Sequence, residues 1–158
     1  DADDVWPRGT LAALLDSLSG KPHSGVARGK VQTLVSGEVA PRLKSRIRTT
    51  PRYAVNLGSA LFRTEALVRV EFLDANLRFD EDSDLWFRLW EADIPLISLD
   101  RVTLLYRLHT ANMTRDAVDD RKAFLHLVKR HRDRTLGRST KSAIRLAEYL
   151  GWHQDLQT

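Results

Sequence analysis

The 158-residue sequence contains no cysteine, and this absence excludes two classes of protein. Without thiols the chain forms neither a disulfide framework nor a thiolate metal site. The sequence also lacks any apolar run that approaches the roughly 20 residues of a membrane-spanning helix. No signal peptide is recognisable in the acidic stretch at its start, so we expect a cytoplasmic protein.

What the sequence does contain is an ordinary globular composition with an uneven distribution of charge. Hydrophobic residues make up 42% and charged residues 29%, which is typical of a soluble domain. The net charge is +4, but residues 121–145 hold nine Lys or Arg and one Asp, a local balance of +8. This basic segment predicts either a solvated helical face or a surface that contacts phospholipid headgroups, nucleic acid or an acidic partner.

The most distinctive stretch is residues 79–90 (FDEDSDLWFRLW). Four carboxylates lie within positions 80–84, directly ahead of two of the chain's four tryptophans. Leucine and tryptophan then recur at the spacing of one helical face, which predicts a helix buried on that side. The acidic residues would cap its N-terminus. A capping box uses one or two such residues, so we expect a carboxylate to remain for chemistry.

The order of the other predicted elements indicates a mixed α/β fold. Residues 38–52 are rich in arginine and predict an exposed loop, while Thr64 and Ser139 are predicted helix caps. The predicted helices are 7–19, a short one from 64, 116–134 and 139–150, and the predicted strands are 25–35, 53–62 with an interruption at Gly58 and Ser59, 94–99 and 102–108.

Four motifs in this order resemble those of family-two glycosyltransferases with the GT-A fold. Residues 1–6 (DADDVW) and the leucine-rich helix after them resemble the metal-binding Asp-x-Asp segment of that family. Residues 58–67 (GSALFRTEAL) look like its glycine-containing stretch beside the acceptor site, and 81–89 (EDSDLWFRL) are similar to its Glu-Asp motif. Residues 106–112 (YRLHTAN) resemble the segment that follows.

The resemblance spans about residues 1–115 and implies a partial GT-A fold, a mixed sheet flanked by helices. In that family a Rossmann-like half that holds most of the nucleotide precedes the Asp-x-Asp segment. The given sequence starts at this segment, so the resemblance implies the second half of such an enzyme. Residues 1–115 would then form the acceptor and metal side, and residues 116–158 a basic C-terminal helical segment.

The resemblance also implies an activity, the inverting transfer of a sugar from a nucleotide-sugar donor to a hydroxyl of a glycan, lipid-linked or protein acceptor. Asp82 would be the general base that removes the proton of this hydroxyl. Asp3 and His109 would ligate Mg²⁺ or Mn²⁺, which neutralises charge on the departing diphosphate. Asp1 and Arg107 would lie on the donor side.

Glu81, Gly58 and Ser59 would lie on the acceptor side. Burial or the neighbouring Glu81 is expected to raise the pKa of Asp82 toward the working pH. Three further residues are expected to fix the helix against the sheet, namely Asp84, Trp86 and Arg88.

Other function classes remain open on the sequence alone. One alternative is a catalytically inactive module that associates with itself or with a partner through an exposed sheet edge. Binding of nucleic acid by residues 121–145 is not expected, because Phe124 is the single aromatic residue there. The same segment predicts contact with an anionic membrane at its inner face, through Phe124, Leu125 and Val128 beside Lys122, Lys129, Arg130 and Arg132. The alternative is that this apolar side packs on the domain.

Overall fold

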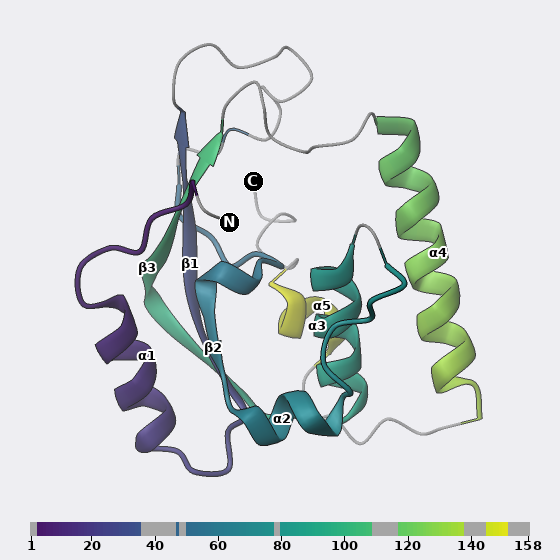
Figure 1. Cartoon of the computed structure of the whole chain (residues 1–158), viewed down its shortest axis with the longest axis horizontal. Helices are drawn as coiled ribbons and strands as arrows, with labels where there is room; N and C mark the ends of the chain where they lie inside the picture. Colours follow the sequence, from purple (N-terminus) through teal and green to yellow (C-terminus); the bar gives the residue numbers. More distant parts are fainter. Residues whose placement is uncertain are drawn as a thin grey trace.

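The computed structural model describes residues 3–35, 47, 50–77, 80–108, 117–137 and 145–151. A three-stranded mixed sheet in the order β2-β1-β3 forms its centre (Figure 1). Strand β1 (Val26–Val35) pairs parallel with β3 (Leu96–Leu108) and antiparallel with the short β2 (Ala60–Phe62). The expectation of an α/β fold with a mixed sheet flanked by helices is confirmed.

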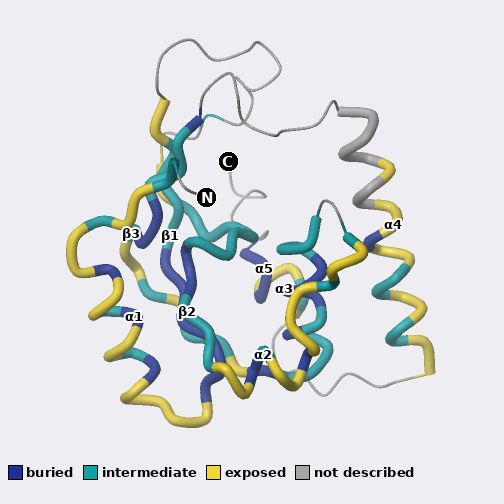
Figure 2. Tube along the Cα trace, viewed as in Figure 1, coloured by how far each residue is buried: buried dark blue, intermediate teal, exposed yellow. Residues whose placement is uncertain are grey.

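Alternate residues of β1 enter two hydrophobic layers on opposite faces of the sheet. Ala27 contacts Leu14 and Leu18 of helix α1 (Thr10–Ser19). Val26 belongs to a larger cluster with Trp86 of helix α3 (Glu81–Glu91), which covers the other face. The 3-10 turn η2 (Leu57–Ser59) precedes β2, and helix α2 (Thr64–Arg69) follows β2. Figure 2 shows many of the buried positions on the strands of the sheet and on α3.

Helices α4 (Ala117–Thr135) and α5 (Leu146–Leu150) pack on α3. Leu127 of α4 is 5% exposed and lies in the same hydrophobic cluster as Tyr149 of α5 and Trp86. The Tyr149 hydroxyl donates a buried hydrogen bond of 3.0 Å to the carbonyl oxygen of Ile94. The C-terminal helices therefore share a core with the sheet side, while a division of the chain at residue 115 stays a prediction.

Strand β3 is continuous where the sequence predicts two strands. Arg28 pairs with Ser98, and Lys30 pairs with Val102, so β3 has more residues than β1 between these two pairs. The extra residues form a bulge that includes Asp100, whose carboxylate pairs with the ammonium of Lys30. The polar residues at 100–101 that predicted a turn mark this bulge instead.

Gly29 lies opposite the bulge and has no room for a side chain. A Cβ atom there would lie 2.3 Å from the Cγ2 atom of Thr103 and 2.6 Å from the carbonyl oxygen of Arg101. The bulge and the close approach of β1 to β3 therefore depend on the glycine.

Two predicted helix starts and one predicted cap are wrong. Helix α1 begins after Gly9 and not at residue 7, because Gly9 has a left-handed φ of 78° that ends the preceding turn. Helix α2 begins at Thr64 itself, with extended Arg63 before it, so Thr64 is not the cap. Helix α5 begins directly after Arg145, whose backbone is extended, and the predicted cap Ser139 lies outside the described residues.

Two further expectations concern connecting segments. Residues 53–56 are not a strand, although the predicted close backbone approach at Gly58 is confirmed, since a Cβ there would lie 3.2 Å from the side-chain oxygen of Asn56. Most of the predicted loop at 38–52 lies outside the described residues. Within the described ranges no helix is long and apolar enough to cross a membrane.

Candidate active site

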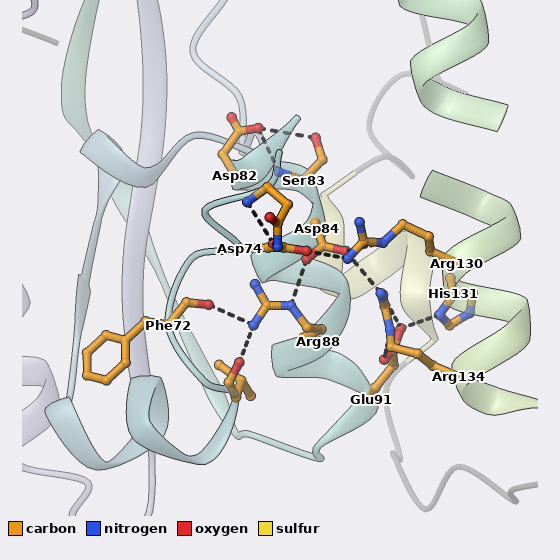
Figure 3. Close-up of polar contacts among 12 residues, drawn as sticks. Phe72, Asp74, Asp82, Ser83, Asp84, Arg88, Glu91, Arg130, His131 and Arg134 are labelled. Carbon is orange, nitrogen blue, oxygen red and sulfur yellow. Dashed lines mark hydrogen bonds and ion pairs between the residues drawn. The ribbon is translucent and has the colours of Figure 1, made fainter. Parts of the chain in front are cut away.

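Asp82 lies in the first turn of α3 and is half-buried. Its Oδ1 atom accepts a hydrogen bond of 2.6 Å from the backbone N–H of Ser83 and one of 3.4 Å from the Ser83 hydroxyl (Figure 3). Asp80 precedes the helix with a left-handed φ of 58°, and its side chain makes no capping hydrogen bond. The acidic stretch was expected to cap the helix, and the acidic residue at the cap position, Asp80, does not do so with its side chain.

The environment of Asp82 raises the pKa of its carboxyl group to about 6, from a model-peptide value of 3.8. Burial is the largest cause, because it disfavours the charged form, and the negative charges of Glu81 and Asp80 add to it. The hydrogen bonds from Ser83 act in the opposite direction. No described lysine or arginine forms an ion pair with Asp82. A carboxyl group with this pKa changes its protonation state close to neutral pH, which suits a general base.

The segment that begins at Asp3 is hydrogen-bonded to the C-terminal end of β3. The backbones of Val5 and Leu105 exchange two hydrogen bonds of 2.8 and 3.1 Å. The carboxylate of Asp4 accepts a hydrogen bond of 2.9 Å from the backbone N–H of Arg107. The structure thus brings the predicted metal-binding segment beside Arg107, one of the residues predicted for the donor side.

Gly58 joins the same neighbourhood through a tryptophan. The indole N–H of Trp6 donates a hydrogen bond of 2.6 Å to the carbonyl oxygen of Gly58. Ser59 is fully buried, and its carbonyl oxygen accepts a hydrogen bond of 2.8 Å from the Thr103 hydroxyl. The backbone around Gly58 and Ser59 is therefore fixed to both β3 and the N-terminal segment.

Figure 1 relates Asp82 to this neighbourhood. The residues after Asp3 and the last residues of β1 and β3 lie toward the upper end of the sheet in that view, and α3 begins at its own upper end. Asp82 is thus on the part of α3 that is nearest that end of the sheet. Asp4 and Trp6 were not singled out from the sequence as contact residues. The signal for Asp4 is present, as a third carboxylate beside the Asp-x-Asp pair.

The predicted metal site is described only in part. Of the two predicted ligands, His109 lies outside the described residues and Asp3 within them, and the donor-side residue Asp1 also lies outside. Within the described part of the chain, no group of three or more His, Asp or Glu side chains is placed to hold a metal ion. One carboxylate is not a sufficient ligand set for Mg²⁺ or Mn²⁺. The described residues alone do not fit the ion, and its binding stays a prediction.

The other carboxylates of the acidic stretch have a structural role. Asp84 is completely buried and lies 2.7 Å from Nε of Arg88, 3.0 Å from Nη1 of Arg134 and 3.7 Å from Nε of Arg130 (Figure 3). Arg88 also donates hydrogen bonds to the carbonyl oxygens of the segment after α2. The expectation that Asp84 and Arg88 fix α3 against the sheet is wrong, because they connect α3 to α4 and to that segment.

Glu91 extends this ionic network along the same side of α3. Arg134 makes two hydrogen bonds to its carboxylate, of 2.7 and 2.9 Å, and Nδ1 of His131 lies 2.6 Å from it. The His131 ring also contacts the aromatic rings of Phe87 and Trp90, at centroid distances of 5.1 and 5.8 Å. The α4 helix is thus attached to α3 mainly by charged and aromatic contacts around Leu127.

Trp86, in contrast, packs against the sheet as expected, and it contacts a buried cation there. Its indole ring lies 5.6 Å from the ring of Phe62 and 5.2 Å from the guanidinium of Arg28, which also lies 5.2 Å from the ring of Tyr53. Arg28 is 1% exposed, and burial lowers its pKa to about 10. The strand pattern of residues 25–35 did not predict an arginine on the inner face.

Comparison of the chain with protein-family models and with curated proteins finds no match. The functional assignment therefore depends on the four motifs and on the geometry around Asp82.

Proposed function

We propose that the chain is the acceptor and metal side of an inverting glycosyltransferase with a partial GT-A fold. The observation that carries this proposal is Asp82, a half-buried carboxyl group with a pKa of about 6 in the first turn of the helix that bears the Glu-Asp motif. Two features support it. The N-terminal acidic segment, Arg107 and Gly58 lie together at one end of the sheet, and α3 begins toward that end (Figure 1).

In the proposed reaction Asp82 accepts the proton of an acceptor hydroxyl. The hydroxyl oxygen forms a bond to the anomeric carbon of the donor sugar, while the bond from that carbon to the nucleoside diphosphate breaks and its electron pair leaves with the diphosphate. This single displacement inverts the configuration. Above a pH of about 6 Asp82 is mostly ionised and ready to act, and the Ser83 hydrogen bonds hold one of its oxygens. The other oxygen would accept the proton of the acceptor hydroxyl.

A divalent cation is part of the proposal, with Asp3 and His109 as the residues that would hold it and Asp1 and Arg107 on the donor side. Bound there, such an ion would neutralise charge at the leaving group. Glu81, Gly58 and Ser59 are proposed on the acceptor side. The acceptor is a glycan, a lipid-linked saccharide or a protein, and the reaction would take place in the cytoplasm or at the inner face of the membrane.

The decisive experiment measures nucleoside diphosphate release from a panel of UDP- and GDP-sugars, with Mn²⁺ and candidate acceptors. It uses the chain together with any coding sequence that precedes Asp1. We expect Asp82→Asn to lower the rate by about 10²- to 10⁴-fold, the usual contribution of a general base. The matched control is Asp16→Asn, which changes an exposed carboxylate of α1 on the other face of the sheet. Equal rates for Asp82→Asn and the parent would exclude Asp82 as the base.

A second candidate function is a self-associating or partner-binding module without catalysis. The observation that favours it is the outer edge of β3, where Val5 alone among the described residues forms a bridge, at Leu105. Open strand edges accept a further strand from another chain. Sedimentation equilibrium that shows a stable dimer, together with no release of nucleoside diphosphate by the parent chain, would favour this function over transfer.

A further inference from the structure

Helix α4 has two unlike faces. One face is buried against α3 through Leu127, His131 and Arg134. The opposite side is exposed and follows a single stripe with alternating steps of three and four residues, 122, 125, 129, 132 and 136. We call this side, including the adjacent position 128, the outer face of α4, and its residues are Lys122, Leu125, Val128, Lys129, Arg132 and Leu136.

Large apolar side chains of the outer face are open to solvent. Leu125 is 67% exposed, Val128 39% and Leu136, directly after the helix, 77%. The apolar side that the sequence predicts to pack on the domain is therefore turned outward at Leu125 and Val128, because Leu127 takes the inward position. Figure 2 shows exposed residues along much of α4, and Figure 1 places the helix at the edge of the molecule.

The cations of α4 divide in the same way. Arg130 and Arg134 point inward and are paired with Asp74, Asp84 and Glu91 (Figure 3). The sequence alone groups Arg130 with the outward cations, and the structure removes it from that group.

The outward cations have few described carboxylates as partners. No described carboxylate forms an ion pair with Lys122 or Lys129, and the neighbouring Asp133 offsets Arg132, at 3.1 Å. The outer face thus carries a net positive charge that the described carboxylates do not neutralise.

We propose that the outer face of α4 binds the surface of a bilayer that contains anionic phospholipid, with the helix parallel to that surface. Charge complementarity carries the inference. Exposed leucines interleaved with cations suit the boundary between headgroups and acyl chains, where apolar tips enter and the long stems of Lys and Arg reach the phosphates. Binding of single-stranded nucleic acid commonly uses aromatic side chains on which the bases stack, and none of the described side chains of this face is aromatic. This inference does not depend on the proposed transferase activity.

Co-sedimentation of the chain with vesicles tests the proposal, using phosphatidylcholine alone and phosphatidylcholine mixed with phosphatidylglycerol. We expect binding to the mixed vesicles that weakens as salt is added. Lys122→Gln with Lys129→Gln should weaken it by about 30-fold, since each cation near an anionic surface contributes roughly fivefold. Leu125→Gln with Leu136→Gln should weaken it by about tenfold or more.

Two control pairs separate the outer face from general surface effects. Leu11→Gln with Leu15→Gln changes two leucines of α1 that are each 52% exposed, and Arg8→Gln with Lys21→Gln removes two exposed cations elsewhere. Both control pairs should bind like the parent, and circular dichroism should show the same helix content in all variants. Equal binding to both vesicle types, outer-face variants that bind like the parent, variants that instead dissolve a dimer, or tighter binding to RNA than to lipid would each overturn the proposal.

Discussion

Asp82 and Asp84 are two positions apart on α3, yet they have opposite surroundings. Asp84 is fully buried, and three guanidinium groups around it offset its negative charge. Asp82 is half-buried beside Glu81 and Asp80, and Ser83 is its hydrogen-bond donor among the described residues. Figure 3 shows the carboxylate of Asp82 directed away from α4 and the carboxylate of Asp84 directed toward the α4 arginines.

The difference teaches which of two like side chains is free for chemistry. Both carboxylate oxygens of Asp84 lie against arginines of α3 and α4 and are not open to a substrate, so Asp84 stabilises the attachment of α4. A carboxylate without a cation and with a raised pKa exchanges a proton near pH 6, so Asp82 is the candidate base. Sequence motif and charge are the same at both positions, and the environment separates them.

The largest effect is expected where the comparison is most extreme. Asp84→Ala leaves three arginines without their buried partner and should lower the free energy of unfolding by about 3–5 kcal/mol. Urea denaturation at pH 7 measures it, with Asp16→Ala on the exposed side of α1 as the control. A loss of less than about 1 kcal/mol would mean that the arginines find other partners and that Asp84 is not the centre of the network.

A smaller effect is expected for one of the cations. Arg134→Gln removes charged hydrogen bonds to Asp84 and Glu91, but Arg88 still pairs with the first and His131 with the second. We expect a loss of about 1.5–3 kcal/mol, measured by the same urea titration. Arg132→Gln on the outer face of the helix is the matched control and should unfold at the parent's urea concentration. Equal losses for both variants would show that charge alone, and not the inward position, matters.

The smallest effect has the opposite sign and concerns Asp82. Its folded-state pKa of about 6 is above the unfolded value of 3.8, so the unfolded chain releases its proton first and stability falls as the pH rises from about 4 to 6. Asp82→Asn removes this penalty, which is at most about 3 kcal/mol for a shift of about two pKa units, but the neutral amide accepts the Ser83 hydrogen bonds less strongly. We therefore expect a net stabilisation of about 1–2 kcal/mol at pH 7–8 that vanishes below pH 4. Thermal denaturation across this pH range measures the difference. A destabilised Asp82→Asn protein at pH 8 would place Asp82 with Asp84 as a structural carboxylate.

Local patterns predicted most elements of the fold. Periodicity located α1, α3 and α4 within a few residues, because each buries one regular face, and a loosely alternating stretch that ends in a turn signal located β1. The bulge in β3 was missed because residues 100–101 have the composition of a turn, and the outcome depends on pairing with β1, which no local pattern contains. Gly9 and Arg63 set helix starts through backbone angles that side-chain patterns do not reveal.

The candidate site was predictable only in its first half. The acidic stretch, with more carboxylates than capping needs, singled out Asp82, and the role of Asp82 as the base stays a prediction. The role of Asp84 was not predictable, because Arg134 is 50 positions away in the sequence and only the packing of α4 on α3 brings the two side chains together. The same holds for Arg28, whose burial depends on the rings of Tyr53 and Trp86.

The contact between Gly29 and Thr103 has a consequence for how variation in this protein is to be understood. Any substitution at Gly29 drives a carbon atom into the neighbouring strand, so a library of random variants should retain glycine there as strictly as it retains a reactive group. Strict retention of glycine at this position would reflect the close contact between two strands and not a chemical role. The tolerance of each position to substitution is therefore best compared with the space that the backbone leaves there for a Cβ atom.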